Sequence, residues 1–283
     1  MRKQGYRPST IQATINTLKA LTKQTPLLDP EAVKTQLAHA QVSVNRKEKI
    51  CQDLARFYRY RGIHFDMPRY NRIPKLPFIP LEAEIDQLIS GVGSKTATFL
   101  RLLKETGMRP GEAWNLKWID LDLERSAVTI TPEKGSNPRQ LRISNRLIQM
   151  LSHQPHKWTY IFRNPQIQPE KSMRTFQKGY EQQRQLLAEK LQTPRIESIS
   201  FRTLRHWKAS TLYNKTRDIL LVKATLGHRC IQSTLVYTHL LASKEDDFIC
   251  KVAKDVKEAA SLIELGYDYV TDVEGMKLFR KRK

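Results

Sequence analysis

Two arginines, a histidine and a tyrosine stand where they could carry out chemistry on a phosphodiester. Arg109 lies in a Thr-Gly-Met-Arg-Pro-Gly-Glu segment, Arg205 in a Phe-Arg-Thr-Leu-Arg-His segment, and His228 precedes Tyr237 by nine residues. A guanidinium is permanently charged and binds pairs of oxygen atoms. Arg109 and Arg205 could therefore clamp a phosphate to which His228 hydrogen-bonds, and Tyr237 could attack the phosphorus.

The charge of the chain indicates a polyanionic partner. The 283 residues carry a formal net charge of +21, and the sequence pI is about 10.0. Residues 1–80 hold 15 Lys and Arg against 5 Asp and Glu, so this part is the more basic one. Cationic side chains that neutralise phosphates gain affinity from counterion release. A solubilising charged surface is the alternative.

The composition gives no sign of a metal, a cofactor or a membrane. Cys51, Cys230 and Cys250 are widely spaced and form no CxxC pair, so neither a zinc site nor a disulfide framework is predicted. No apolar run approaches the roughly 18 residues that span a bilayer, and the basic start leads into a polar helix rather than a signal-peptide core. We expect a cytoplasmic, nucleoid-associated protein that needs no cofactor.

Residues 1–66 are predicted to form a helical DNA-binding domain. Ser9 or Thr10 could cap a first helix whose apolar positions follow a helical period, namely Ile11, Ile15, Leu18 and Leu21. The Asp29-Pro-Glu segment predicts the start of a second helix. A third is expected near residues 47–60.

The third helix is expected to present a basic and aromatic face. That face would carry Arg56, Arg59 and Arg61 beside Tyr58 and Tyr60. Such a combination suits a nucleic-acid backbone, although a solvated helix face is the alternative. Residues 67–80 follow with four prolines in fourteen positions and predict a basic linker, with Arg69, Arg72 and Lys75 as further candidate DNA contacts.

Residues 81–283 are predicted to form the second domain, which makes the fold mainly α with a small antiparallel β-sheet (α+β). Alternating patterns predict strands at 127–131 and 139–143, joined by a turn that holds Lys134. Helices are expected at 81–90, 95–106, 168–192 and 204–225, and a further short strand at 158–162. The tail, 246–283, is expected to contain a helix at 255–265 and a hairpin of 267–270 with 276–279.

These motifs resemble those of the tyrosine recombinase (phage-type integrase) family, and the tail resembles that of archaeal integrases. Thr106–Glu112 with Leu116–Asp120 is similar to the family's first arginine box. Phe201–His206 and Thr225–His228 through Tyr237 are similar to its second box. The resemblance covers residues 77–245. Each short motif is weak alone, and the ordered combination is specific.

The resemblance implies a site-specific DNA recombinase that cleaves and rejoins strands through a 3′-phosphotyrosyl intermediate. Tyr237 would be the nucleophile, and Arg109, Arg205 and His228 would bind the phosphate. Lys134 falls where the family places its general acid, with Arg139 as a weaker neighbouring candidate. A helical core-binding domain and the catalytic domain would close around double-stranded DNA, and four protomers would assemble on two DNA sites as a homotetramer.

Three further residues bear on this expectation. Arg202 stands where the family usually carries His; it could act as a third clamp, because arginine cannot accept a proton. Glu112 could orient Arg109 from three residues away or simply be a helix-start carboxylate. We interpret His206 as a packing or orienting residue. An unperturbed phenol has a pKa near 10, and we expect nearby cations to help Tyr237 ionise.

Two other activities remain open at this point. A type IB topoisomerase uses similar residues, although the Leu-Gly-His to Tyr spacing favours a recombinase. A non-catalytic DNA-binding regulator with a degenerate site is the other alternative, since Arg202 replaces the usual histidine. The target sequence, the direction of recombination and the action of Tyr237 in its own or a neighbouring protomer do not follow from the sequence.

Overall fold

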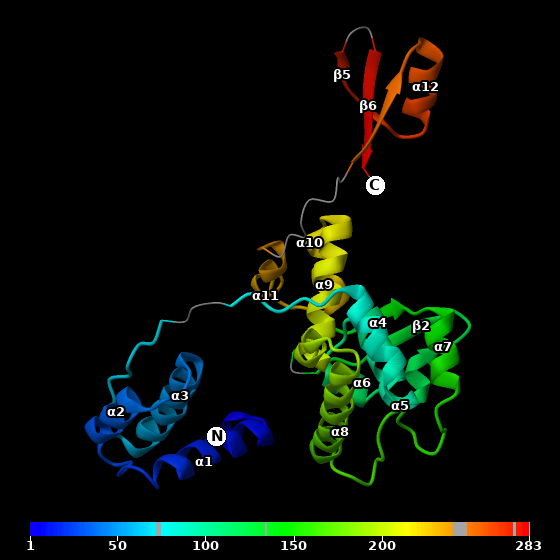
Figure 1. The fold of residues 1–283 in the computed structure, drawn as a ribbon. Helices are drawn as coiled ribbons and strands as arrows, with labels where there is room; N and C mark the ends of the chain where they lie inside the picture. The colour runs from blue at the N-terminus through cyan, green and yellow to red at the C-terminus, as the bar shows by residue number, and fades with distance from the viewer. Residues whose placement is uncertain (72–74, 134, 240–247, 274–275, 283) are drawn as a thin grey trace. The chain divides into compact units, whose positions relative to one another are not determined.

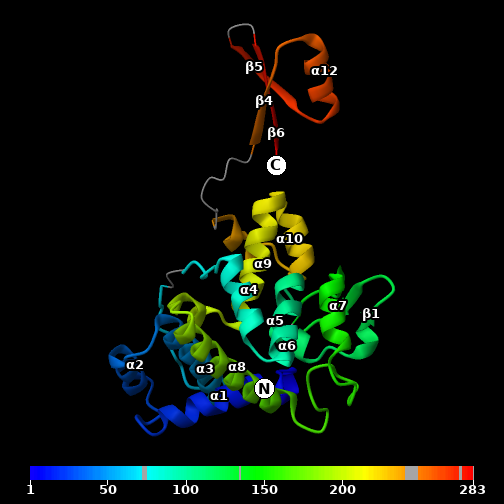
Figure 2. The same ribbon diagram turned by 45° about the vertical axis from the view of Figure 1, so that its right-hand side comes forward.

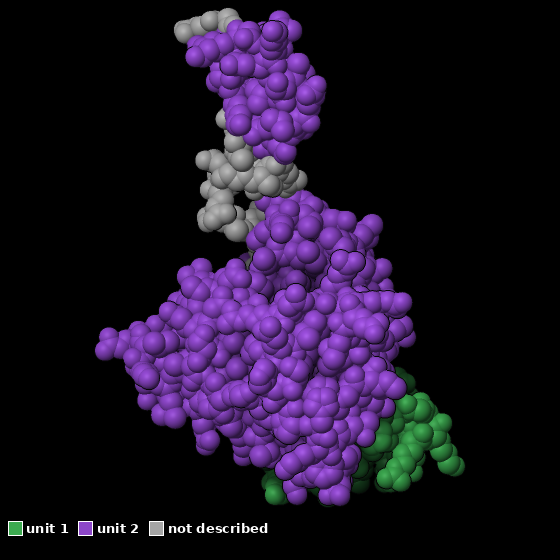
Figure 3. All heavy atoms as spheres, turned by 90° about the vertical axis from the view of Figure 1, so that its right-hand side faces the viewer, with its two compact units in different colours: residues 1–75 green, residues 76–283 purple. Residues whose placement is uncertain are grey.

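The chain divides into two compact units, Met1–Lys75 and Leu76–Lys283, coloured separately in Figure 3. The boundary falls inside the proline-rich segment 67–80. Each unit has its own buried core. The computed structural model describes residues 1–71, 75–133, 135–239, 248–273 and 276–282.

The first unit is built from three α-helices after a short 3-10 helix (Figure 1). In chain order these are η1 (Arg2–Gln4), α1 (Pro8–Leu21), α2 (Pro30–His39) and α3 (Val44–Arg61). The predicted start of α2 is confirmed, because the Asp29 carboxylate accepts hydrogen bonds from the backbone N–H groups of Glu31 and Ala32 at 2.9 and 3.1 Å. Helix α3 ends at Gly62, whose φ of 69° suits glycine.

Three sequence predictions for this unit are wrong. Helix α1 begins at Pro8 without a side-chain cap, so neither Ser9 nor Thr10 caps it. Its buried face includes Thr14 rather than Ile15, which is 39% exposed, because Thr14 donates a hydrogen bond to a buried carboxylate of α3.

The third wrong prediction concerns Tyr58. Its ring lies in the core against Phe57 and Phe65, with centroids at 5.5 and 4.7 Å, and does not join the basic face.

The second unit consists of helices and a small sheet, which lies beside α7 (Asn145–Ser152) (Figures 1 and 2). The antiparallel sheet has the order β1 (Leu121–Asp122), β2 (Ala127–Ile130), β3 (Arg139–Arg142). The helices are α4 (Glu82–Gly91), α5 (Ser94–Thr106), α6 (Pro110–Trp114), α7 (Asn145–Ser152), α8 (Pro169–Lys190), α9 (Phe201–Thr216), α10 (Ile219–Leu226) and α11 (Gln232–Leu235), with 3-10 helices η2 (Trp118–Asp120), η3 (Pro194–Ser198) and η4 (Val236–His239). The α+β class and the two main strands are confirmed.

An aromatic cluster joins the helices of this unit. The Phe99 ring of α5 meets Trp114, Phe162 and Phe201 edge-on, with centroids 5.9, 5.0 and 4.9 Å away. Edge-to-face packing of this kind stabilises the fold beyond the contribution from burial of the apolar rings. Helix α5, which precedes the first arginine motif, thereby lies against α9, which carries the second.

Two elements differ from the sequence prediction. The helix expected over 204–225 is two helices, because Arg217 adopts a φ of 54° and Asp218 caps α10. The strand expected at 158–162 is only an isolated bridge between Lys117 and Tyr160.

The tail forms a small module with its own core. It consists of β4 (Phe248–Ala253), α12 (Val256–Glu264), β5 (Asp268–Val273) and β6 (Met276–Arg282), with strand order β4-β6-β5. The predicted helix and hairpin are confirmed, and β4 adds a strand that the sequence did not indicate. The Phe279 ring is buried in this module, at 2% exposure.

Candidate active site

The sequence-predicted residues come from four elements of the second unit. Arg109 immediately precedes α6, Arg205 lies in the second turn of α9, His228 follows α10, and Tyr237 lies in η4. Local signals fix these positions. Gly107 ends α5 with a φ of 62°, and Gly227 ends α10 with a φ of 67°. These left-handed caps turn the chain just before Arg109 and His228.

Arg205 is buried and joins the two motif regions. Its Nη1 donates to the Gly107 carbonyl at 2.7 Å, and its Nη2 donates to the Leu226 carbonyl at 2.8 Å. These bonds use two of the five N–H donors of a guanidinium. Burial lowers the pKa of Arg205 to about 10, and the charges of Arg109 and Arg139 act in the same direction. Arg205 therefore stays protonated at neutral pH.

Glu112 is the anionic centre around which the arginines gather. Its fully buried carboxylate accepts hydrogen bonds from Arg109 Nη1 at 3.2 Å, Arg139 Nη2 at 2.8 Å and Ser136 Oγ at 2.7 Å. It also accepts one from the Arg109 backbone N–H at 2.9 Å. Burial would raise the pKa of Glu112, but these hydrogen bonds outweigh it and lower the pKa to about 2.

Glu112 thus serves both suggested purposes, since it caps α6 and orients Arg109. The sequence spacing indicated the contact between Glu112 and Arg109, but it did not indicate that Ser136 and Arg139 also bind this carboxylate. With Arg205 nearby, three guanidinium groups face one carboxylate. The positive charge left over among these four groups favours an anion such as a phosphodiester.

Arg139 fastens the β2–β3 hairpin to the end of α10. Its Nε donates to the Thr225 carbonyl at 2.8 Å, and the Asn137 backbone N–H donates to the Gly227 carbonyl at 3.0 Å. Arg139 is almost fully buried, with 6% of its side chain exposed. Lys134, the predicted general acid, lies outside the described residues.

Tyr237 is buried beside His206. Its Oη lies 3.0 Å from His206 Nδ1, and its side chain is 2% exposed. Burial raises the pKa of Tyr237, while the charges of Arg205, Arg202 and Arg109 lower it less. The nearby cations therefore favour ionisation of this phenol, as expected, but desolvation is the larger effect and leaves its pKa above the ordinary value.

The two histidines of the site are held differently. His228 Nδ1 lies 2.9 Å from Thr234 Oγ1, and burial together with Arg205 and Arg109 lowers its pKa to about 4. It is therefore neutral at pH 7. When Thr234 donates this bond, the other ring nitrogen carries the proton and can act as a donor. His206 Nδ1 is hydrogen-bonded to the Tyr237 hydroxyl, a partner that the sequence did not indicate.

Arg202 is exposed on the first turn of α9. Its charge lowers the pKa of both His206 and Tyr237, which indicates that it lies near them. No group of three or more metal-ligating side chains occurs among the described residues. Across the same part of the chain, no helix is long and apolar enough to cross a membrane.

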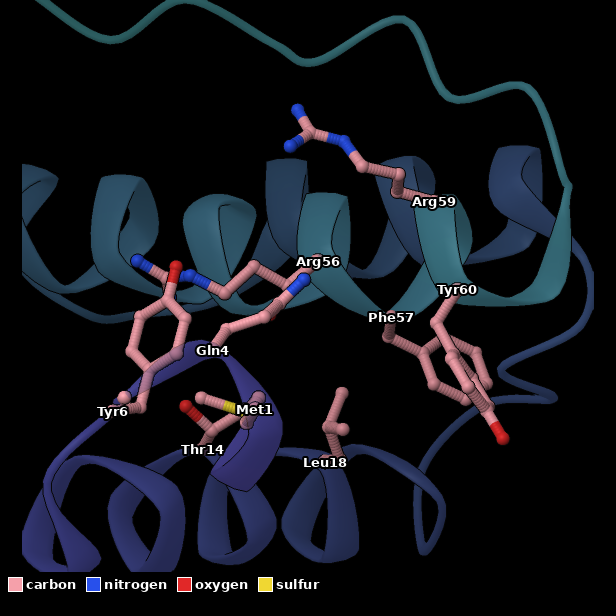
Figure 4. A pocket seen from close by; sticks show the side chains of 10 residues that line it. Met1, Gln4, Tyr6, Thr14, Leu18, Arg56, Phe57, Arg59 and Tyr60 are labelled. Carbon is pink, nitrogen blue, oxygen red and sulfur yellow. The ribbon is translucent and has the colours of Figure 1, made fainter.

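The predicted basic face of the first unit borders a hollow of about 760 Å³ between η1, α1 and α3 (Figure 4). Arg56 extends alongside the Tyr6 ring, 5.6 Å from its centroid, and also pairs with the buried Asp53 at 2.8 Å. Arg59 and Tyr60 line the same hollow, and Tyr60 is 86% exposed.

The other predicted DNA contacts vary in position. Arg61, Arg69 and Lys75 are exposed, and Arg72 lies outside the described residues. Arg56 is partly held by its ion pair, so Arg59 and Arg61 are the more available cations of α3.

The model of the phage integrase family matches residues 81–244. A probable integrase/recombinase protein of Methanocaldococcus jannaschii is 28% identical over 207 residues, which cover 67% of this chain and 62% of that protein. The tyrosine recombinase XerA of Pyrococcus furiosus is 25% identical over 233 residues, which cover 78% of this chain and 76% of the relative.

Solved structures share the fold at lower identity. The Tn1549 transposon integrase, in complex with transposon right end DNA, has a TM-score of 0.64 and 15% identity, with 94% of this chain and 96% of that chain covered. A lambda integrase dimer bound to a COC′ core site has a TM-score of 0.61 and 13% identity, covering 82% of this chain and 92% of the other.

Proposed function

We propose that this chain, which belongs to the phage integrase family, is a tyrosine-type site-specific DNA recombinase that cleaves and rejoins strands through a 3′-phosphotyrosyl intermediate. One observation carries the proposal: a buried phenol, Tyr237, lies within electrostatic reach of Arg205, Arg202 and Arg109. These arginines come from two motifs about a hundred positions apart in the chain, and Arg205 links both through its bond to the Gly107 carbonyl.

The reaction exchanges one phosphodiester for another. The Tyr237 oxygen forms a bond to phosphorus, the bond from phosphorus to the 5′-oxygen breaks, and that oxygen leaves as a hydroxyl after taking a proton. An incoming 5′-hydroxyl reverses these steps and releases the tyrosine. Catalysis of phosphoryl transfer rests on positioning and charge stabilisation. Because the intermediate keeps a phosphodiester bond, religation needs no nucleotide.

Each arginine has a part in this proposal. Arg109 and Arg205 bind the non-bridging oxygens, whose charge grows in the transition state, and His228 donates a hydrogen bond to the same group. Arg202 serves as a third cation near the phenol. A bound phosphodiester would add negative charge beside Tyr237 and offset the excess positive charge of the arginines. Lys134 is assigned as the acid that protonates the departing 5′-oxygen, with Arg139 holding the hairpin that bears it.

The partner is double-stranded DNA. The net charge of +21 and the exposed Arg59 and Arg61 of α3 support backbone contacts by the first unit. Residues 1–66 would act as the core-binding domain, 67–80 as the linker and 81–283 as the catalytic domain. Exchange between two duplexes cuts four strands, and each chain contributes one Tyr237, so a homotetramer on the DNA follows. Such a protein would work at the nucleoid in the cytoplasm.

A covalent-trapping assay tests this function. A target duplex is selected by binding from a random pool and nicked at successive positions, so that the released fragment diffuses away and religation stops. Wild-type protein should form an adduct that survives a denaturing gel, and Tyr237→Phe should form none. An adduct with Tyr237→Phe would refute the assigned nucleophile. Tight binding without any adduct at any nick would favour a non-catalytic regulator, and supercoil relaxation by monomers without site preference would favour a topoisomerase.

A further inference from the structure

The hydroxyl of Tyr237 has a specific partner in a histidine that the family motifs leave unassigned. His206 Nδ1 lies 3.0 Å from Tyr237 Oη, and the two rings are 5.9 Å apart at an angle of 48°. Among the hydrogen bonds of the described residues, this is the one that the hydroxyl makes. Since the Tyr237 side chain is 2% exposed, bulk water has little access to receive its proton.

The cations around the phenol cannot take this proton. Arg202, Arg205 and Arg109 all act on Tyr237 electrostatically, but a guanidinium has no acceptor atom. His228 is engaged elsewhere, with Nδ1 on Thr234 at 2.9 Å. An attacking phenol must nevertheless lose its proton as the bond to phosphorus forms, because its pKa lies above the ambient pH and the group is protonated at pH 7.

His206 is suited to the task. Burial and the charges of Arg202 and Arg205 lower its pKa, so the imidazole is neutral at pH 7 and keeps one acceptor nitrogen. Both arginines lie on α9, the helix of His206 itself, and Tyr237 faces the imidazole from η4. Arg202 stands where the resembling family usually carries His, and it supplies charge without a proton-accepting atom. Base and cation are thus separate side chains on one helix.

We propose that His206 is the general base of strand cleavage, which rests on the proposed recombinase function. As Tyr237 Oη bonds to phosphorus, its proton passes to His206 Nδ1 and the imidazole becomes imidazolium. The bond from phosphorus to the 5′-oxygen breaks, and that oxygen takes a proton from Lys134 or from water. On religation His206 returns the proton to the departing phenolate.

The test compares His206→Asn with wild type in the nicked-duplex assay over a range of pH. An asparagine side chain can accept the hydrogen bond of the phenol but cannot take its proton. General bases contribute about 10²–10⁴-fold to rate, so adduct formation at pH 7 should fall by about that factor. Because the pKa of His206 lies below its ordinary value, the wild-type rate should not change with pH at neutral and higher pH. The rate of the variant should instead rise about tenfold per pH unit, because hydroxide replaces the base.

A matched control is His153→Asn. His153 is exposed, and its Nδ1 lies 2.6 Å from the Gln149 carbonyl, so it is a hydrogen-bonded histidine away from the site. Its replacement should leave the rate and the pH profile of adduct formation unchanged. His206→Ala provides a second test, because added imidazole should restore its cleavage in proportion to concentration.

The outcomes separate the two proposals. If wild type forms an adduct through Tyr237 while His206→Asn reacts within threefold of the wild-type rate and keeps its pH profile, His206 only anchors the phenol. The same conclusion follows if His206→Ala is folded and binds DNA, but neither imidazole nor high pH raises its rate of adduct formation. If wild type forms no adduct, or if Tyr237→Phe does, the recombinase function itself fails and the role of His206 falls with it.

Discussion

Replacement of Glu112 by glutamine should destabilise the second unit by about 3 kcal/mol at pH 7. The Glu112 carboxylate is fully buried and binds Arg139 Nη2 at 2.8 Å, Ser136 Oγ at 2.7 Å and the Arg109 backbone N–H at 2.9 Å. Its pKa falls from 4.5 to about 2 on folding. At about 1.4 kcal/mol for each pKa unit, this fall corresponds to the stated magnitude. A neutral amide also leaves the buried arginines without their anion.

The pH dependence gives the sharper signature. Because folding lowers the pKa of Glu112, its stabilisation is fully present above about pH 4.5 and is lost as the pH falls through about 2. The glutamine has no such titration. The difference in unfolding free energy between wild type and Glu112→Gln should therefore shrink from about 3 kcal/mol at pH 7 to about 1.5 kcal/mol at pH 3.

Urea unfolding at pH 7 and pH 3, followed by tryptophan fluorescence, measures this difference. Glu82→Gln is the matched control, since Glu82 pairs with Lys104 at 2.9 Å but is 64% exposed, and Lys104 keeps a second partner in Asp86. Glu82→Gln should lower the free energy of unfolding by less than about 1 kcal/mol. The reasoning is refuted if Glu112→Gln is as stable as wild type at pH 7, or if its deficit is the same at both pH values.

Three further substitutions test other parts of the account. Gly227→Ala should cost at least about 1–2 kcal/mol, measured by thermal unfolding, because φ is 67° and the new methyl would lie 2.9 Å from the Asn137 carbonyl. Arg139→Lys should slow adduct formation at least tenfold without loss of DNA binding, since a lysine cannot reproduce the fork that also holds Glu112; equal rates would contradict this. Asp53→Asn should lower the unfolding free energy of the first unit by about 1–3 kcal/mol in urea titrations, since this carboxylate is fully buried and accepts hydrogen bonds from both α1 and α3.

The local part of the site could be predicted from sequence because it depends on short-range rules. Asp29 before proline indicated the start of α2, and three-residue spacing indicated that Glu112 could reach Arg109. Alternation and turn residues indicated β2 and β3 and the hairpin of the tail. Such patterns depend on the two-residue period of strands, the 3.6-residue period of helices and the residues that cap helices, and these elements form where the patterns predict them.

The remaining contacts depend on tertiary packing, which a single sequence does not encode in any short spacing. His206 and Tyr237 are 31 positions apart, and the Arg139 bond to the Thr225 carbonyl spans 86. Tyr58 was misplaced because a tyrosine between arginines fits an exposed face and a core equally well. The break at Arg217 escaped prediction because a left-handed φ is rare outside glycine.

The central claim is that Tyr237 becomes joined to DNA within a site of clamping arginines. Trypsin digestion of the trapped adduct, followed by nuclease treatment and mass spectrometry, tests it most directly. Cleavage after Arg229 and Lys244 gives a peptide in which Tyr237 is the single tyrosine. The account predicts that this peptide carries the residual nucleotide phosphate on Tyr237. Attachment to any of the other nine tyrosines, or to a serine, would contradict it.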